Sequence, residues 1–198
     1  MILFQNIKKE LPFKIFYKNY QRALEAKQKN IEAIAISSFN KITNEVDSRF
    51  VNLKYVNEDK FIFFSNYNSP KSLAFDSNNQ ISGLIFWPSI NLQIRLKAKI
   101  KKTSKRFNQN YFQTRLIDKN ALAISSRQSQ IIKSFDLVKE NYKKIKETED
   151  LLKCPKYWGG FTFKPYEIEF WEGNKYRLNK RDCYKRKGKV WHHSILEP

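Results

Sequence analysis

From Ile31 onward the chain consists of short segments rich in β-branched and aromatic residues, and this feature limits the fold more than any other. The clearest segment, residues 92–100, reads LQIRLKAKI, with an apolar side chain at every second position. Because successive side chains of a strand point to opposite faces, this alternation predicts a half-buried strand with one core face and one polar face. Asn, Asp and Ser cluster between the segments, as they do in turns between antiparallel strands.

Three stretches instead have the spacing of amphipathic helices. They are residues 12–29, RFNQNYFQTR (106–115) and SQIIKSFDLVKENYKKIKETEDLL (129–152), the last with Phe135, Val138, Tyr142 and Ile145 on one side. Strand-like sequence precedes the second stretch and resumes after the third, in residues 161–171, YRLNKRDCY and KVWHHSIL. Because helices and strands do not alternate regularly, we expect a mainly β fold, an antiparallel barrel with appended helices, and not a doubly wound sheet.

The length of 198 residues suits one domain, since a single hydrophobic core usually serves about 100 to 200 residues. We expect an N-terminal amphipathic helix region at residues 1–30 and the β domain at residues 31–198, with a helical insertion at about 104–153. Hydrophobic residues make up 41% of the chain, which is enough to offset chain entropy and argues against global disorder.

The formal charge of +19 raises the question of a nucleic-acid or membrane-surface partner. The basic residues are spread from Lys8 to Lys189 and several alternate with apolar side chains, which is typical of a solvated basic surface. We therefore expect no nucleic-acid and no membrane partner. A positive field would still help attract a phosphorylated ligand.

Several chemistries have little support in this sequence. With five glycines and neither GxGxxG nor GxxxxGK[ST], no loop can cradle phosphate with its backbone, so side chains must hold any phosphate. His192 and His193 are adjacent and the only histidines, and Cys154 and Cys183 lack metal or disulfide spacing, so we expect no metal site. The cysteines, and the lack of a signal-peptide pattern at the N-terminus, favour the reducing cytoplasm.

What remains is a set of cationic and amide side chains, most of them on predicted strands, near aromatic residues. Arg offers a planar fork for phosphate, Gln can hydrogen-bond the edge of a heteroaromatic ring, and Trp or Tyr can cover its face. The set comprises Arg49, Lys54, Lys71, Gln93, Arg95, Gln128, Arg177 and Arg181.

The segments around these residues resemble those of pyridoxamine 5′-phosphate oxidases, in the same order along nearly the whole chain, from Pro12 to Pro198. They are RFVNLK (49–54), FSNYNSPKS (64–72), LQIR (92–95), YFQTR (111–115), SSRQS (125–129), PKYWGG (155–160), IEFWEG (168–173) and RLNKR (177–181). The combination of WGG with IEFWEG and the following R-L is the most specific part of the resemblance.

The resemblance implies an antiparallel split β-barrel that works as a homodimer with flavin mononucleotide (FMN) at the subunit interface. By matching position, Arg49 and Lys71 would hold the FMN phosphate. Gln93, Gln128 and Ser129 would contact the ring system and ribityl chain, partly from the second subunit, and Trp171 and Arg181 would complete the pocket. Backbone and packing contacts to FMN would come from Phe50, Val51, Asn52, Leu53, Phe64 and Ser65, and Lys54, in the same RFVNLK segment, is also expected among the cofactor-binding residues.

The resemblance also implies the reaction: oxidation of pyridoxamine or pyridoxine 5′-phosphate to pyridoxal 5′-phosphate, with O2 as acceptor and H2O2 as product. The substrate phosphate would lie among Lys54, Tyr111, Arg115 and Lys119. Arg177 and Asn179 match the residues placed over the pyridine ring and would be the catalytic pair.

The chain departs from the family near the substrate. Asn179 stands where the family has His in R-L-H-D-R, Lys119 where it has Ser, Pro70 where it has Arg, and Leu92 where it commonly has Arg. Asn retains hydrogen bonding but cannot titrate. These changes leave two alternatives open: a related FMN-dependent oxidase of another substrate, of the phenazine-biosynthesis type, and a non-catalytic flavin- or pyridoxal-phosphate-binding paralogue.

Overall fold

The computed structural model describes all 198 residues and is built around one ten-stranded sheet. The strand order is β1-β4-β5-β8-β7-β6-β2-β3, and a β9–β10 hairpin branches from β8. All pairings are antiparallel except that of β1 with β4, which is parallel. The strands are β1 Leu3–Gln5, β2 Ala33–Asn40, β3 Glu45–Asn52, β4 Tyr55–Asn57, β5 Lys60–Asn66, β6 Gln80–Trp87, β7 Leu92–Lys102, β8 Trp158–Glu172, β9 Lys180–Lys187 and β10 Val190–Ile195.

Strand β7 confirms the predicted alternation, and β6 alternates in the same way. On β7 the apolar positions from Leu92 to Ile100 are buried, while the side chains between them are exposed or half-buried. The core is a cluster of 26 buried residues, most of them aromatic or β-branched. Trp87 is fully buried within it, and its indole Nε1 donates to the Ile31 carbonyl at 3.1 Å, so its polar atom is satisfied.

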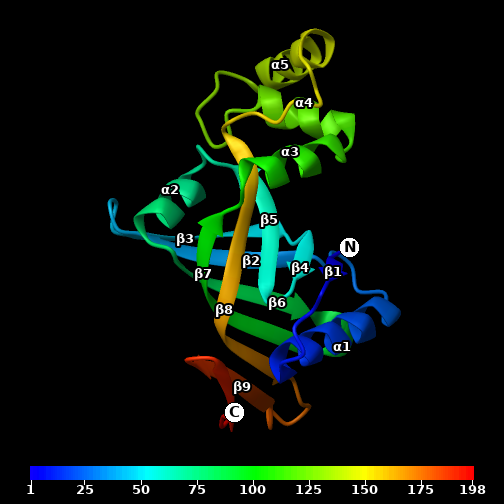
Figure 1. The fold of residues 1–198 in the computed structure, drawn as a ribbon, viewed down its shortest axis with the longest axis vertical. Coiled ribbons are helices and arrows are strands. Elements are labelled where there is room, and N and C mark those ends of the chain that lie inside the picture. Colours follow the sequence, from blue (N-terminus) through cyan, green and yellow to red (C-terminus); the bar gives the residue numbers. More distant parts are fainter.

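The helices gather in two places (Figure 1). Helix α1, Leu11–Glu25, lies beside the sheet and buries Phe13, Phe16 and Tyr20 in the core. Helices α3 Lys105–Gln113, α4 Ile117–Ser125 and α5 Phe135–Thr148 form a group at one end of the molecule, and β9 lies at the other (Figure 1). A short helix α2, Pro70–Ser77, and a 3₁₀ turn, η1 at Pro88–Ile90, complete the elements. None of the helices has the length and apolar character that crossing a lipid bilayer would require.

The structure differs from the sequence-based expectations at several boundaries. RFVNLKYV forms two strands, because the chain turns its fully buried Leu53 into the core between β3 and β4. The third predicted helix begins at Phe135, where the Ser134 hydroxyl accepts from Leu137 N as an N-cap. Helices α2 and α4 were not predicted, and β1 adds a strand to the region expected to be only helical.

Candidate functional site

A buried ammonium group marks the first part of the site. Lys71, on α2, is only 7% exposed and forms no ion pair. Its Nζ donates to Ser69 Oγ at 3.1 Å and to Gln128 Oε1 at 3.4 Å. Burial lowers the pKa of Lys71 to about 8, and the nearby charge of Arg49 contributes in the same direction. A buried cation that has only neutral acceptors is suited to receive an anion.

Arg49 lies close to this ammonium on β3. Its guanidinium donates to Ser38 Oγ at 2.9 Å and to the Ile36 carbonyl at 3.3 Å, and it pairs with the exposed Asp47. A cavity of about 650 Å³ lies here, lined in part by Arg49, Gln128 and Ser129. Ser65 on β5 reaches the same place by donating to Gln128 Oε1 at 3.3 Å.

The first part of the site, which we call the phosphate cradle, therefore combines side chains from β3, β5, α2 and the loop after α4. Its members are Arg49, Ser65, Lys71, Gln128 and Ser129.

A second part, the ring row, crosses β7, β8 and β9. Gln93 is the register partner of Trp171, and Trp171 is the partner of Arg181. Glu169, which is only 7% exposed, accepts from Arg181 Nε at 2.8 Å and from Arg95 at 3.3 Å. This carboxylate neutralises and fixes two cations beside the row. Arg95 in turn donates to Gln93 Oε1 at 3.3 Å, which orients that amide.

The side chains of the phosphate cradle and those of the ring row project from opposite faces of the sheet. Direct register partners share a face, and Phe50, Leu84 and Arg95 lie on one line of partners across β3, β2, β6 and β7. Arg49 neighbours Phe50 along β3 and so points the other way, whereas Gln93 shares the Arg95 face. One copy of the chain thus does not join these two parts.

Residues 50–53, which follow Arg49, differ in their exposure to solvent. Phe50 is 75% exposed on the ring-row face, whereas Leu53 is fully buried in the core and offers a ligand only its backbone. Val51 and Asn52 complete β3 between them.

A third part, the cation cluster, lies near α3 and α4. It contains Lys54, Arg115 and Lys119, and none of the three forms an ion pair. Burial lowers the pKa of Lys54; the charge of Glu32 opposes that shift, and the charges of Lys119 and Arg115 add to it. Arg115 also donates to the Lys119 carbonyl at 3.3 Å, which places these two residues side by side. Tyr111 completes the cluster by stacking on Phe64, with 3.7 Å between ring centroids and an interplanar angle of 11°.

Phe64 therefore packs with the cation cluster, while its neighbour Ser65 faces the phosphate cradle. Strand β5 separates the two groups.

Arg177 and Asn179 lie in the loop between β8 and β9. Arg177 has a positive φ of 60°, and the Asn179 Oδ1 accepts from Asn174 N at 3.0 Å, which holds the loop. The cation cluster touches the opposite end of β8, at Trp158. The 15 residues of β8 span roughly 45 Å, so the two groups lie far apart within one chain.

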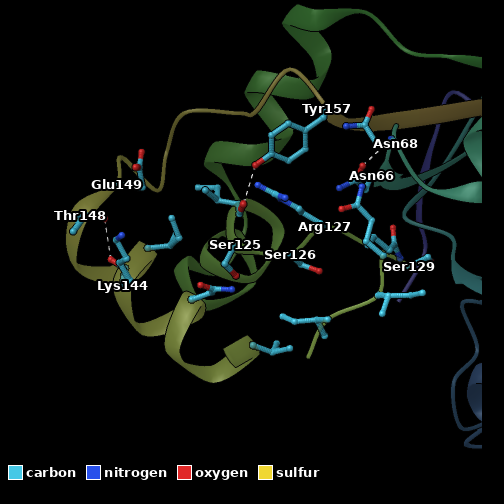
Figure 2. Close-up of a pocket in the computed structure, with 18 residues that line it drawn as sticks. Asn66, Asn68, Ser125, Ser126, Arg127, Ser129, Lys144, Thr148, Glu149 and Tyr157 are labelled. Carbon is cyan, nitrogen blue, oxygen red and sulfur yellow. Dashed lines mark hydrogen bonds between the residues drawn. The ribbon is translucent and has the colours of Figure 1, made fainter. Parts of the chain in front are cut away.

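A larger cavity, of about 1000 Å³, adjoins the phosphate cradle (Figure 2). It lies between α4, α5 and the loop that follows α4, and Gln128 and Ser129 line both cavities. Tyr157 reaches into its wall and donates from its hydroxyl to the Ile124 carbonyl at 2.8 Å.

Sequence reasoning missed several residues of these groups. Ser38 and Ser69 bind the two cradle cations, but a single serine on a strand or before a proline carries no sequence signal. Trp158 could have been found, because it belongs to the quoted WGG motif. Its ring lies under the Arg115 guanidinium, 4.4 Å from ring centroid to Arg Cζ.

The glycine after Trp158 yields a first testable prediction. A Cβ on Gly159 would lie 2.2 Å from Tyr67 Oη and 2.3 Å from Asn108 Nδ2. Those groups bond to each other at 3.0 Å, and Asn108 Oδ1 also accepts from Gly160 N at 2.9 Å. Gly159→Ala should therefore lower the free energy of unfolding by about 1–3 kcal/mol, measured by urea denaturation.

Gly188→Asn is the matched control for this prediction. Gly188 has a φ of 59° and nothing within 4 Å of an added Cβ, and Asn tolerates that conformation. Its unfolding free energy should change little. Equal losses in both variants would contradict the steric explanation.

The fold and the site define a class of protein. The structure superposes with a TM-score of 0.89 on PhzG from Burkholderia lata 383, at 21% identity and covering 94% of this chain and 92% of the other. A pyridoxamine 5′-phosphate oxidase-related, FMN-binding protein from Nostoc punctiforme gives a TM-score of 0.77 at 11% identity, covering 96% and 100%. The chain is mainly β with a few helices and has the fold of these two proteins.

Sequence similarity narrows the class to a family. A pyridoxine/pyridoxamine 5′-phosphate oxidase of Hydrogenovibrio crunogenus is 34% identical over 191 residues, covering 94% of this chain and 88% of the relative. One from Colwellia psychrerythraea is 36% identical, covering 84% and 77%. Residues 158–198 match the family model described as the pyridoxine 5′-phosphate oxidase C-terminal dimerisation region. The chain belongs to the pyridoxine/pyridoxamine 5′-phosphate oxidase family.

Proposed function

We propose that the chain is an FMN-dependent oxidase that converts pyridoxamine 5′-phosphate or pyridoxine 5′-phosphate to pyridoxal 5′-phosphate. The observation that carries this proposal is the cation cluster, in which none of the three basic side chains forms an ion pair, although Glu32 partly offsets the charge of Lys54. It is separate from the phosphate cradle, so the chain has one place for the phosphate of a cofactor and another for that of a substrate.

The phosphate cradle fits FMN on the chemistry of its donors. Lys71 is a buried ammonium without a counter-ion, and Arg49 offers a guanidinium fixed by Ser38. The Gln128 amide oxygen accepts from Lys71 and Ser65, in the place where an anion's oxygen could accept instead. Pro70 removes one family donor, but two cations remain, enough for a phosphate monoester.

We further propose that the chain works as a homodimer with FMN between the subunits, in a split-barrel domain comprising residues 31–198. The family's C-terminal dimerisation region matches residues 158–198, which contain Trp171 and Arg181. On the face that carries the ring row, Phe50, Leu84 and Phe86 are 75%, 41% and 51% exposed. An apolar face of this kind is suited to cover a partner and a ring system.

In the proposed reaction the protein binds the substrate, orients it and excludes bulk water from the site. FMN, when bound, would accept a hydride from C4′ while the 4′-hydroxyl or 4′-amino group loses a proton, and O2 would take up the two electrons and two protons as H2O2. Pyridoxine 5′-phosphate would give the aldehyde directly, whereas pyridoxamine 5′-phosphate would give an imine that a water molecule hydrolyses to the aldehyde and ammonia. The cation cluster holds the substrate phosphate, Gln93 can hydrogen-bond the ring edge, and Trp171 borders the ring. Arg177 supplies a cation near the pyridine. Asn179 orients the loop through Asn174 N and moves no proton.

The alternative oxidase of another substrate is favoured by two features, Lys119 and Asn179, which depart from the family in the substrate site. A non-catalytic paralogue would bind flavin without turnover. We place the protein in the reducing cytoplasm, which accords with its free Cys154 and Cys183.

Anaerobic flavin reduction tests the proposal and separates these alternatives. Purified protein should take up FMN, and either phosphorylated vitamer should then bleach the visible absorbance of the oxidised flavin, with H2O2 released on readmission of air. Failure to bind FMN would contradict the cofactor assignment. Flavin that binds but is reduced by neither vitamer would favour the alternatives.

A further inference from the structure

Arg115 is a half-buried guanidinium with no acidic partner, although burial alone would disfavour its charge. Burial lowers the pKa of Arg115, yet Arg stays protonated in proteins. A charge in this position must be stabilised by other groups, or else its side chain would turn to solvent. Its neighbours therefore show what holds it.

Aromatic rings, above all that of Trp158, lie against the flat face of the guanidinium. The Cζ of Arg115 lies 4.4 Å from the ring centroid of Trp158 and 5.4 Å from that of Phe112. Trp158 is only 6% exposed and stacks on Phe64 at 5.3 Å with an interplanar angle of 10°. A tryptophan face is the most favourable aromatic surface for a cation, and this one is fixed by its own packing.

A second neighbour holds the edge of the guanidinium. Asn120 Oδ1 accepts from Arg115 NH1 at 3.1 Å, and Asn120 has no exposed surface. Both amide hydrogens of Asn120 are already used, since Nδ2 donates to the carbonyls of Phe112 and Leu151 at 2.9 Å each. The amide thus has only one orientation that satisfies it, with its oxygen toward Arg115.

The remaining donors of Arg115 are left for a ligand. Of the five N–H donors of an arginine, one on NH1 bonds Asn120 and one on NH2 bonds the Lys119 carbonyl at 3.3 Å. The other three form no hydrogen bond within the chain; Lys119 is in contact through its carbonyl, and Lys54 is within range of the Arg115 charge. A planar fork beside two ammonium groups matches a phosphate monoester dianion.

We infer that Trp158 and Asn120 are positioning residues that hold Arg115 flat and turned toward the substrate phosphate, and so determine selectivity for phosphorylated substrates. The inference rests on the proposed function for the identity of the substrate. Trp158 lies against the face of the guanidinium and Asn120 at its edge, so both would act on the substrate through Arg115.

The test is titration of inorganic phosphate into the FMN-loaded protein by calorimetry, where FMN already occupies the cradle. Trp158→Leu and Asn120→Ser should each weaken phosphate binding about tenfold, and Trp158→Phe should restore most of it. In turnover, KM for pyridoxine 5′-phosphate should rise by a similar factor with kcat nearly unchanged. Activity with unphosphorylated pyridoxine, where measurable, should not change.

Gln109→Ala is the structural control. Gln109 also ties the segment after α5, by donating to the Leu152 carbonyl at 2.9 Å and accepting from Cys154 N at 3.0 Å, but it does not touch Arg115. The Gln109→Ala substitution should lower the free energy of unfolding without weakening phosphate binding. Unchanged phosphate affinity in folded Trp158→Leu and Asn120→Ser, or an equal loss in Gln109→Ala, would overturn the inference.

The phosphate titration also separates two kinds of failure. If the FMN-loaded protein oxidises neither vitamer, the proposed function fails, whereas the dependence of phosphate affinity on Trp158 and Asn120 is measured independently of turnover.

Discussion

A mixed dimer of one Arg115→Ala subunit and one Arg177→Ala subunit is expected to be active, although each variant alone is nearly inactive. Each should lose on the order of 100-fold in kcat/KM alone, since each removes a charged contact to the substrate. Arg115 lies by Trp158 at one end of β8, and Arg177 follows the other end of this 15-residue strand. If both contact one substrate, as proposed, they must come from different subunits.

In a dimer with a twofold axis, a mixed pair carries both lesions in one site and none in the other. Mixed dimers isolated with two affinity tags should show about half the wild-type activity per dimer. Mixing Arg115→Ala with Lys54→Met is the matched control. Both residues belong to the cation cluster, so each site of that dimer keeps one lesion and stays inactive. Recovery in the control, or none in the first pair, would contradict a shared site.

Replacing Lys71 by methionine should weaken FMN binding on the order of 100-fold, because one charge-assisted bond to the phosphate is lost from a buried position. The same change should stabilise the protein without FMN at neutral pH. Burial lowers the pKa of Lys71 from its ordinary 10.5 to about 8, which corresponds to on the order of 3 kcal/mol against the charged form. Methionine removes that cost.

The lowered pKa of Lys71 also determines how the stability of the FMN-free protein and its affinity for FMN should change with pH. Between about pH 8 and 10 the unfolded chain keeps the proton on Lys71 that the folded, FMN-free chain has lost, so stability should rise with pH there. FMN affinity should fall over the same range, because the phosphate binds the protonated form. Fluorescence titrations of FMN and urea denaturation at pH 7 and 9 measure both.

Lys101→Met is the control, since Lys101 is exposed and outside the cradle. A loss of FMN affinity in Lys101→Met that matches the loss in Lys71→Met would show that net charge, and not the cradle, controls binding.

The sequence predicted the strands better than the short helices. Alternation in residues 92–100 identified β7 directly, because every second side chain is buried. Helix α2 escaped notice because its eight residues begin at Pro70 and have little apolar periodicity. Helix α4 was also missed because it is short, with nine residues, and buries only Asn120 and Ala121.

The site was less predictable than the sheet. From residue pattern alone, Arg49 and Lys54 could only be assigned to opposite faces, and the structure places them in different groups. The association of Arg49 with Lys71 depends on how α2 packs on β2, the strand that pairs with β3, and no local pattern encodes this packing. Asn120 is a clearer case, since its role follows only from three hydrogen bonds made after folding.

Strand β8 has a consequence for evolution and engineering. It carries Trp158 near one end and Trp171 near the other, and it pairs with β5, β7 and β9 along its length. A single inserted residue would reverse the direction of every later side chain and shift the register with all three neighbours. Length changes should therefore accumulate in connections such as residues 41–44, while β8 and the loop that carries Arg177 and Asn179 keep a constant length among descendants of this chain.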